Sequence, residues 1–581
     1  MSSPKRKLLS GNEAVARGAY EAGVLFAAAY PGTPSTEILE ALATYEEVDC
    51  QWSPNEKVAM EVAIGASMCG ARSLVAMKHV GLNVASDALM TLSYTGIKGG
   101  LVVVSADDPG MHSSQNEQDN RNYAKFAKIP MLEPSDSEEA RLFVRRAFEI
   151  SERFDTPVLL RVTTRISHSK SVARLGVRKE LNRELSFEKN VAKYVMVPAN
   201  ARLRHTLVEK RLESLSALSD RIPINRIEKG NPAYGGTLGI ITSGVAYQYC
   251  KEVAPGASYL KLGMSYPLPV RKVHEFARMV KKLVVVEELD PFLEEQVRAM
   301  GLKVHGKPAE LRCGELNPEL VREILTGKKN PASGGVSGGR PPVMCPGCGH
   351  RGVFYVLSRL KVPVTGDIGC YTLGALPPLQ SLDTCICMGA AIGNAAGMSR
   401  VLPPEKRKRV VAVIGDSTFL HAGMPGLMDM AYNRTPGTVI ILDNSTTAMT
   451  GRQDHPGTGR TLKGTETKTI DYEKLCLALG ADSVRTVDPY NLEDVEFAVR
   501  AAMEEKGLSV VISRRQCVLI GRMRHAAPLR VDADKCTRCK VCLRLGCSAI
   551  LLNEDGTIEI DPLLCNGCGM CSQVCRVEAI L

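Results

Sequence analysis

Two cysteine runs near the carboxyl end constrain this chain more than any other part of its sequence. The first run, CTRCKVCLRLGC, begins at Cys536, and the second, CNGCGMCSQVC, begins at Cys565. Each run carries four cysteines, and thiolates two residues apart can converge on one soft-metal centre. The chain has 19 cysteines in all. In a compartment that keeps thiols reduced, so many cysteines favour metal binding or catalysis over disulfides.

The spacing of these runs resembles the bacterial ferredoxin pattern, in which the last cysteine of each run binds the cluster of the other run. The resemblance implies two 4Fe-4S clusters, one held by Cys536, Cys539, Cys542 and Cys575, and the other by Cys565, Cys568, Cys571 and Cys547. The first run departs from the pattern in having four residues instead of three before its last cysteine, and Ser548 and Arg576 replace the usual prolines. A pair of zinc sites is the alternative.

Length, hydropathy and charge limit the number of domains, the cellular location and the kinds of partner that we expect. A chain of 581 residues is long enough for about three or four domains. It contains no apolar run near the roughly 20 residues that a membrane-spanning helix needs, and its first residues lack a secretory leader. We therefore expect a cytoplasmic protein without a membrane partner. The net charge of +10 is spread along the sequence, which does not favour a nucleic-acid partner, although a positive face could attract an acidic electron carrier.

Two apolar strands upstream of the cysteine runs each end in an oxygen-bearing side chain. The segment KRVVAVIG ends at Gly415 and is followed by Asp416 and Ser417, and TVIILDNS contains Asn444. Ligands bind at the carboxyl ends of parallel strands in open α/β sheets. The carboxylate and amide oxygens suit a magnesium ion that also holds a diphosphate.

This pair of strands resembles the Gly-Asp to Asn signature of thiamine-diphosphate enzymes. The resemblance implies that Asp416, Asn444 and the backbone carbonyl of Thr446 hold Mg²⁺, with Gly415, Ser417 and Met449 beside the cofactor. Ser417 stands where glycine is common in that family. A Gly-Asp pair after a strand can also be an ordinary turn, and the second strand with the TAMTG that follows it favours the cofactor interpretation.

The segments CPGCGHR and GDIGCY resemble a part of the 2-oxoacid:ferredoxin oxidoreductases that builds an iron–sulfur cluster beside thiamine. The resemblance implies a third cluster held by Cys345, Cys348, Cys370 and Cys517, with Gly366 and Asp367 near the cofactor. The alternative is that these cysteines are reduced turn or core residues. Cys385 and Cys387 compete as ligands, although an apolar, glycine-rich helix start is the favoured explanation for them.

The N-terminal part resembles the pyrimidine-binding domain of the same oxidoreductases through YPGTPSTEI and SPNEKVAMEVAIGASMCGARS. The resemblance implies that Glu56 bonds the aminopyrimidine ring and promotes deprotonation of the thiazolium carbon, and that Thr33 approaches the substrate. Glu61 is the competing glutamate on the same predicted helix. In DDPGMHSSQNEQDNR, Arg121 aligns with an arginine that pairs with the substrate carboxylate in pyruvate-using relatives, while a solvated loop arginine is the alternative.

We predict an α/β fold with two doubly wound parallel-sheet domains that bind thiamine diphosphate, a transketolase-C-like α/β domain and a ferredoxin-like module. The strands in GTLGIITSGVAYQYC and KLVVVEELDPF indicate the transketolase-C-like part, and KNPASGGVSGGRPP is a linker by composition. The predicted domains are residues 1–190 for the pyrimidine, 191–330 for the transketolase-C-like part with its preceding linker, 340–525 for the diphosphate and 526–581 for the two 4Fe-4S clusters.

This domain order is most similar to the alpha subunits of the indolepyruvate-oxidising members of the family. The resemblance implies oxidative decarboxylation of arylpyruvates to aryl-acetyl-CoA with ferredoxin as acceptor, and a small beta subunit that carries the coenzyme A-handling gamma-type domain, in an alpha-two beta-two assembly. Met449 replaces an asparagine of pyruvate-using relatives, which suits a larger aromatic substrate. The alternatives are another 2-oxoacid, such as pyruvate or a branched-chain acid, and a non-enzymatic electron-transfer subunit.

Overall fold

The computed structural model describes residues 6–231, 237–329, 342–520 and 526–581. It divides into two compact units, Met1–Ser337 and Gly338–Leu581. Each unit is described by itself. None of the helices in these described ranges is long and apolar enough to cross a membrane.

A seven-stranded sheet forms the centre of the first unit. Its strand order is β12-β6-β7-β5-β4-β2-β3, and all neighbours are parallel except β12 with β6. Central strands such as LVVVSAD are buried along their whole length because helices cover both faces. The strands are β2 (Phe26–Ala29), β3 (Asp49–Trp52), β4 (Ser73–Lys78), β5 (Leu101–Asp107), β6 (Met131–Leu132), β7 (Val158–Thr163) and β12 (Met264–Tyr266).

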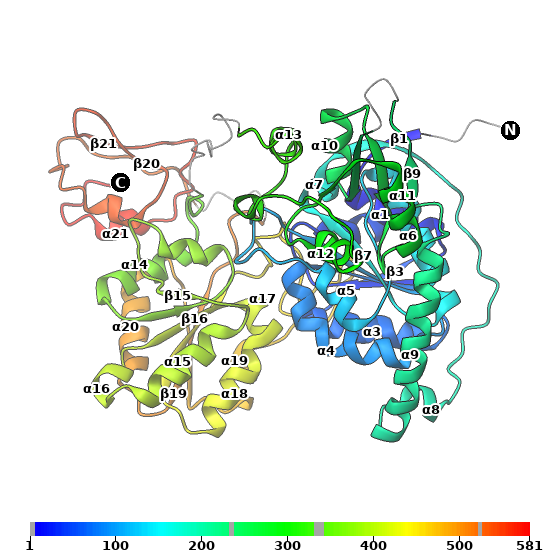
Figure 1. The fold of residues 1–581 in the computed structure, drawn as a ribbon. Helices are drawn as coiled ribbons and strands as arrows, with labels where there is room; N and C mark the ends of the chain where they lie inside the picture. Colours follow the sequence, from blue (N-terminus) through cyan, green and yellow to red (C-terminus); the bar gives the residue numbers. More distant parts are fainter. Residues whose placement is uncertain (1–5, 232–236, 330–341, 521–525) are drawn as a thin grey trace. The chain divides into compact units, whose positions relative to one another are not determined.

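Helices α1 (Gly11–Glu21), α3 (Glu56–Met68) and α6 (Ser137–Phe154) of this sheet start at side-chain caps, and α1 approaches its neighbour at a glycine. Helix α1 begins with a capping box between Ser10 and Glu13. It packs on α6, and a Cβ at Gly18 would lie 2.3 Å from the Arg141 carbonyl oxygen. Helices α3 and α4 (His79–Thr95) form a second packed pair (Figure 1).

A smaller sheet belongs to the same unit. Its order is β13-β10-β11-β9, with β9 antiparallel to β11 and the other neighbours parallel. The strand that follows β11 in the chain, β12, pairs with β6 at the edge of the large sheet and not with the small sheet. The chain therefore passes from the small sheet back to the large one. Buried residues of both sheets share one core cluster. The strands are β9 (Arg226–Glu228), β10 (Leu238–Ser243), β11 (Ser258–Leu262) and β13 (Lys282–Val286).

The second unit is built on a six-stranded, fully parallel sheet with the order β15-β14-β16-β17-β19-β18. Helices α14 (His350–Leu360), α15 (Ala390–Val401), α18 (Met424–Tyr432) and α20 (Leu492–Glu504) cover it (Figure 1). The strands are β14 (Val364–Gly366), β15 (Thr384–Cys385), β16 (Val411–Gly415), β17 (Gly437–Asp443), β18 (Ser483–Val487) and β19 (Leu508–Arg514).

The C-terminal module packs directly on this parallel sheet domain. It contains the hairpin of β20 (Ile550–Leu552) and β21 (Ile558–Ile560) and the short helix α21 (Met570–Val574). Met570 and Val574 belong to the same hydrophobic cluster as Phe354 of α14. The Gln573 side chain donates to the Tyr490 carbonyl at 2.7 Å and accepts from the Leu492 N–H at 3.0 Å. These contacts fix the module relative to the start of α20.

The predicted fold class is confirmed, since both units contain parallel sheets between helices and the chain ends in a small two-stranded module.

Candidate functional site

Four neighbouring strands of the second unit deliver the predicted site residues to one edge of the sheet. Cys370 follows β14, Asp416 follows β16, Asn444 follows β17 and Cys517 follows β19. These strands are adjacent and parallel, so their carboxyl ends meet. The Cys517 N–H donates to the Asn444 carbonyl at 3.0 Å. The topology therefore places the predicted metal ligands and two predicted cluster ligands together.

Asp416 and Asn444 are both buried at this edge. The Asp416 carboxylate accepts the N–H groups of Ser417 at 2.8 Å, Asn444 at 3.1 Å and Ser445 at 2.8 Å, which fixes its direction. Its Oδ2 lies 3.3 Å from Nε2 of His455. The set of one carboxylate, one amide oxygen and the nearby Thr446 backbone suits a hard cation such as Mg²⁺.

His350 connects this oxygen-rich edge to the CPGCG loop. It is the first residue of α14, directly after that loop. Nδ2 of Asn444 lies 3.3 Å from Nε2 of His350. Burial lowers the pKa of His350 to about 4, so the ring is neutral at neutral pH and can accept from the amide. That bond leaves the Asn444 amide oxygen to face the other way, which is the orientation a metal ligand needs.

The four cysteines predicted to hold a third cluster line one cavity of about 100 Å³, together with His350 and Asn444. Burial raises the pKa of the Cys348 thiol to about 12, and Cys345 and Cys370 lie close enough to add to the rise. Burial likewise raises the pKa of Cys370 to about 11, with contributions from Cys517 and Cys345. Such thiols lose their protons only when a metal binds. Cys385 and Cys387 do not line this cavity.

The cysteines of the C-terminal module gather in two groups. Burial raises the pKa of Cys571 to about 12, and its neighbours are Cys568, Cys547 and Cys565, the three thiols that the crossed pairing places in the same cluster. Cys542 has Cys539 and Cys536 as neighbours. Backbone N–H groups donate to two sulfurs, from Leu529 to Cys565 at 3.4 Å and from Ala579 to Cys575 at 3.3 Å. Such N–H···S bonds stabilise cluster thiolates.

Within the described ranges, no three His, Cys, Asp or Glu side chains lie close enough together to hold a single metal ion. A four-iron cluster is larger than one ion and spreads its four thiolates farther apart.

Arg351 joins the cavity to the C-terminal module. This side chain is 1% exposed. Its guanidinium donates to the carbonyls of Met344 at 2.8 Å and Cys345 at 3.0 Å, and also to the Leu545 carbonyl at 2.8 Å. It lowers the thiol pKa values of both Cys348 and Cys568, although burial raises each of them more. One buried cation therefore lies beside cysteines of two different predicted clusters.

In the first unit, Glu56 is the first residue of α3 and is 5% exposed. Its carboxylate packs against the first turn of α4, where a Cβ at Gly81 would lie 2.6 Å from Oε1. Only glycine leaves room for the carboxylate there. The competing Glu61 is exposed and forms an ion pair with Lys57. Thr33 lines a separate cavity of about 480 Å³ in the same unit, with Asp108, Ser113 and Arg165.

Residues 17–216 match the family described as pyruvate flavodoxin/ferredoxin oxidoreductase, thiamine diphosphate-binding, and residues 367–513 match the C-terminal TPP-binding domain of thiamine pyrophosphate enzymes. Residues 558–581 match a 4Fe-4S binding domain. The indolepyruvate oxidoreductase subunit IorA of Pyrococcus abyssi is 42% identical over 99% of this chain and 96% of its own length. This chain belongs to the IorA family.

Other relatives agree with this assignment. IorA of Methanothermobacter thermautotrophicus is 41% identical over 98% of this chain and 96% of its own length. A more distant relative, the 2-oxoglutarate synthase subunit KorA of Archaeoglobus fulgidus, is 28% identical over 55% of this chain and 99% of its own length. The chain is thus an oxidoreductase subunit of the 2-oxoacid:ferredoxin oxidoreductases, and it binds thiamine diphosphate and iron–sulfur clusters.

The other residues predicted to lie near the cofactor are found in the loops at the carboxyl edge of the six-stranded sheet, where most of them make structural contacts. Ser417 accepts a hydrogen bond from the Thr447 hydroxyl at 2.9 Å, and Met449 is 50% exposed. Gly415 and Gly366 lie against Tyr371 and Leu382, where a Cβ would clash. The Asp367 carboxylate accepts the N–H groups of Ile368, Gly389 and Ala391, so it holds the start of α15, and its place beside the cofactor stays a prediction.

The structure does not support the predicted role of Arg121 in binding the substrate carboxylate, nor a solvated loop position. Arg121 is fully buried. Its guanidinium donates to Asp119 and, at 2.6 Å, to Glu287, and it also donates to the carbonyls of Glu288 and Asp290. Burial favours the protonated form of Asp119, but Arg121 and Arg161 outweigh it and lower its pKa. Arg121 is therefore a structural link between the two sheets of the first unit.

The sequence analysis did not predict three residues that position the site: His350, Arg351 and Gly81. His350 and Arg351 lie two and three residues after the predicted ligand Cys348, and Gly81 follows β4 in the segment KHVG. Histidine and arginine next to a cysteine loop were a visible signal, since buried polar groups need partners and a loop that binds a cluster is buried. Gly81 carried no such signal, because its role depends on the packing of α4 against α3.

We expect Arg121→Met to destabilise the first unit by about 3–5 kcal/mol, because the buried carboxylates of Asp119 and Glu287 lose the cation that they share. Among the described residues, only Arg161, 3.9 Å away, remains as an ion-pair partner beside Asp119. The matched control is Arg146→Met on α6, whose exposed pair with Glu149 contributes about 0–1 kcal/mol. Trp52, the only tryptophan of the chain, lies in β3 and reports on this unit. Urea unfolding followed by its fluorescence gives the comparison. Equal unfolding midpoints for the two variants would contradict the structural role.

Proposed function

We propose that this chain is the catalytic alpha subunit of an enzyme that converts arylpyruvates, indolepyruvate among them, to aryl-acetyl-CoA and CO₂. The carboxylate of the 2-oxoacid leaves as CO₂, the acyl carbon forms a bond to the coenzyme A sulfur, and the thiol proton is released. The two electrons reduce two ferredoxin molecules by one electron each. The observation that carries the proposal is the cavity that brings four cysteines together beside Asp416 and Asn444, in a chain of the IorA family.

The residues of the second unit have the chemistry to hold the cofactor. Asp416, Asn444 and the Thr446 carbonyl would bind Mg²⁺ with the diphosphate, and the neutral His350 keeps the Asn444 amide turned toward that ion. Bound thiamine diphosphate supplies a carbon nucleophile that stabilises the negative charge left by decarboxylation. Gly415 and Ser417 shape the turn beside the metal ligands, and Thr447 fixes the Ser417 hydroxyl.

The first unit would supply the proton chemistry. Glu56 is the buried carboxylate that we assign to the aminopyrimidine ring, where it would hold a proton and favour the imino form. Its packing against Gly81 supports this role, since the missing side chain at that position leaves room for the buried carboxylate. We assign Thr33 to the substrate, because it lines a cavity that has room for an organic acid.

The contacts of the second unit support an order for electron transfer. The cluster of Cys345, Cys348, Cys370 and Cys517 would receive electrons first, because its cavity includes Asn444. A Cβ at Gly347 would lie 2.0 Å from Asn566, so the loop between Cys345 and Cys348 contacts the loop between Cys565 and Cys568. The cluster of that second run would come next, and the cluster of Cys536, Cys539, Cys542 and Cys575 last.

The substrate and the partners are the finer part of the proposal. Relatives over the full length are indolepyruvate oxidoreductase subunits, and Met449 offers an exposed apolar side chain after β17. Coenzyme A handling is assigned to a small beta subunit, in a cytoplasmic alpha-two beta-two enzyme. Another 2-oxoacid is the second candidate, since the KorA relative is a 2-oxoglutarate synthase subunit.

Replacing Glu56 tests the thiamine chemistry. We expect Glu56→Gln to lower turnover about 10²- to 10⁴-fold, since an amide cannot hold the proton, while iron content stays at the wild-type level. Glu61→Gln is the control on the same helix and should keep full activity, because Glu61 is exposed. The assay is anaerobic viologen reduction with 2-oxoacid and coenzyme A. Wild-type activity in Glu56→Gln would exclude the assigned role.

The same assay, with the chain co-expressed with its small partner, decides the substrate. We expect the highest kcat/KM for indolepyruvate and phenylpyruvate and much lower values for pyruvate, 2-oxoisovalerate and 2-oxoglutarate. We expect Met449→Asn to reduce the preference for the aryl acids, because a polar amide replaces an apolar contact. A wild-type preference for pyruvate or 2-oxoglutarate would refute the arylpyruvate assignment and leave the cofactor residues unaffected.

A further inference from the structure

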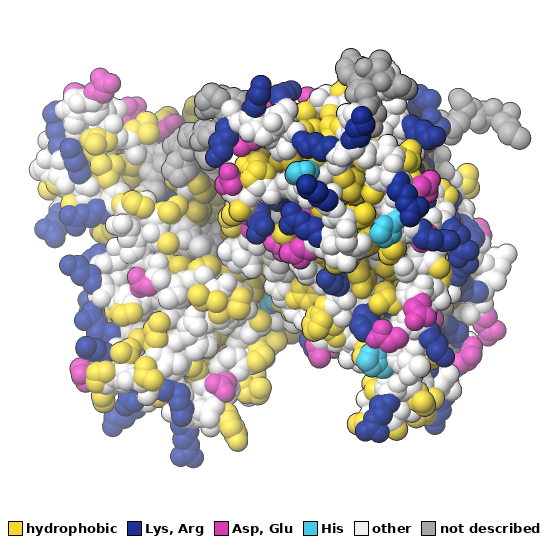
Figure 2. Space-filling view, in the orientation of Figure 1, with side chains coloured by type: hydrophobic (Ala, Val, Ile, Leu, Met, Phe, Trp, Pro, Cys, Tyr) yellow, Lys and Arg dark blue, Asp and Glu magenta, His cyan; other side chains and the backbone are white. Residues whose placement is uncertain are grey.

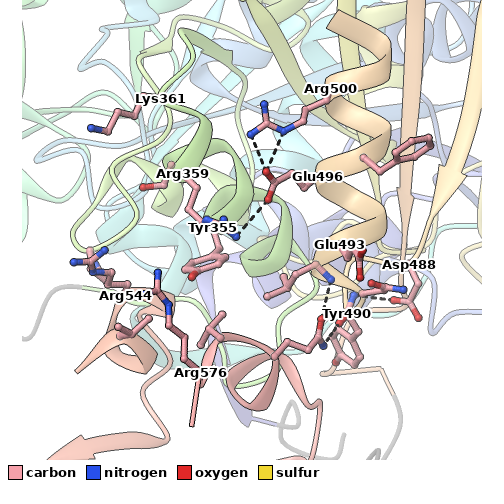
Figure 3. A pocket seen from close by; sticks show the side chains of 18 residues that line it. Tyr355, Arg359, Lys361, Asp488, Tyr490, Glu493, Glu496, Arg500, Arg544 and Arg576 are labelled. Atoms are coloured by element: carbon pink, nitrogen blue, oxygen red, sulfur yellow. Dashed lines mark hydrogen bonds and ion pairs between the residues drawn. The ribbon is translucent and has the colours of Figure 1, made fainter. Parts of the chain in front are cut away.

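A large groove lies between the parallel sheet domain and the C-terminal module, within the second unit. Its volume is about 1440 Å³. Residues of α14 and α20 form one side, and residues around Cys542 and Cys575 form the other (Figure 3). Tyr490 and Gln573 close one end through the hydrogen bonds that dock the module. The described residues leave this groove open to solvent along α20, where Phe497 is 68% exposed.

Positive charge dominates the lining. Five cationic side chains face three acidic ones, namely Arg359, Lys361, Arg500, Arg544 and Arg576 against Asp488, Glu493 and Glu496. Two of the acids are already neutralised: Glu496 pairs with Arg359 and Arg500, and Asp488 pairs with Arg515. Among the described residues, Lys361, Arg544 and Arg576 have no ion-pair partner, and all three are exposed. Figure 2 shows Lys and Arg side chains along this edge of the unit.

The groove also has the apolar component of a protein-binding surface. The exposed Phe497 of α20 is one of the lining residues, and Val541 and Val574 add apolar surface from the module. Aromatic and arginine side chains are enriched at protein interfaces, where an aromatic anchor gives most of the affinity and surrounding charges steer the approach. A small anion would need no exposed phenylalanine, so this combination favours a protein.

The groove reaches the last cluster of the proposed electron path. Val541 and Arg544 flank Cys542, and Val574 and Arg576 flank Cys575. Both cysteines belong to the cluster that the crossed pairing assigns to Cys536, Cys539, Cys542 and Cys575. A partner bound in the groove would therefore contact the backbone segments that hold this cluster on two sides.

We propose that this groove is the docking surface for the electron acceptor, a small acidic iron–sulfur protein of the ferredoxin class. Acidic side chains of the carrier meet Lys361, Arg544 and Arg576, and an apolar patch beside its cluster covers Phe497. In each docking event one electron leaves the cluster of Cys542 and Cys575, which is oxidised, and the carrier's cluster is reduced. The source of the electrons in this inference rests on the proposed function. The assignment of the groove as a docking surface rests on its charge and on its position beside the cluster.

The test measures electron transfer without any 2-oxoacid. The enzyme with its small partner is reduced with dithionite, freed of excess reductant and mixed with an oxidised acidic ferredoxin in a stopped-flow instrument at low salt. We expect Lys361→Glu combined with Arg544→Glu to lower the second-order rate at least about tenfold, because two attractive contacts become repulsive. The difference from wild type should shrink as salt rises. Reduction of methyl viologen, a small cation, should not slow.

Matched control variants distinguish weaker docking of the carrier from loss of the enzyme's own clusters. Lys406→Glu combined with Arg434→Glu makes the same charge change on exposed residues of this unit outside the groove and should leave the ferredoxin rate within about twofold of wild type. Phe497→Ala, which is far in sequence from every cluster cysteine, should also slow ferredoxin and spare viologen. Iron content is measured for each variant, and Phe497→Ala decides the result if the double variant loses iron.

Three outcomes would overturn the proposal. The first is an unchanged ferredoxin rate in both groove variants. The second is an equal loss in the control pair, which would mean that net charge alone matters. The third is loss of the small subunit during purification of the groove variants, which would assign the groove to that subunit. A wild-type enzyme that reduces ferredoxin from dithionite but not from any 2-oxoacid would reject the proposed function and leave the groove intact.

Discussion

The parallel register of four neighbouring strands is the constraint on which the proposed chemistry depends. Because β14, β16, β17 and β19 run in the same direction, the residues that follow them meet at one edge of the sheet. All four strands are buried, and the mainly apolar β16, β17 and β19 are fixed by packing in the core. The hard oxygens of Asp416 and Asn444 and the sulfurs of Cys370 and Cys517 thus share one rigid frame.

The links between these groups pass through buried polar side chains. His350 bonds Asn444, and Arg351 bonds the cysteine loop on one side and the C-terminal module on the other. A buried arginine whose two terminal nitrogens bond three carbonyls is costly to remove, and its charge would favour the more negative, reduced state of clusters held by the cysteines beside it. Arg121 has a similar role in the first unit, where its bond to Glu287 links the two sheets. In both units a single guanidinium holds together segments that are distant in sequence.

The fold was largely predictable from the sequence, and the site was predictable in part. Buried runs such as VVAVIG and TVIILD predict parallel strands, and regular cysteine spacing predicts a cluster module, because both patterns are local. The partners of Arg121 were not predictable. Glu287 lies far along the chain, and only the packing of the second sheet brings it to Arg121. The role of Gly81 depends in the same way on the approach of two helices.

The central claim is that the four cysteines beside Asn444 hold a cluster through which substrate electrons reach the C-terminal module. The most direct measurement mixes oxidised enzyme, with its small subunit and coenzyme A, with indolepyruvate in the absence of an acceptor, and follows cluster reduction by EPR. In wild type we expect the clusters of the module to be reduced. In Cys517→Ala, with about four irons fewer per chain, they should stay oxidised toward the substrate yet still accept electrons from dithionite, whereas Cys387→Ala should behave like wild type. Reduction of the module by indolepyruvate in Cys517→Ala would contradict the account.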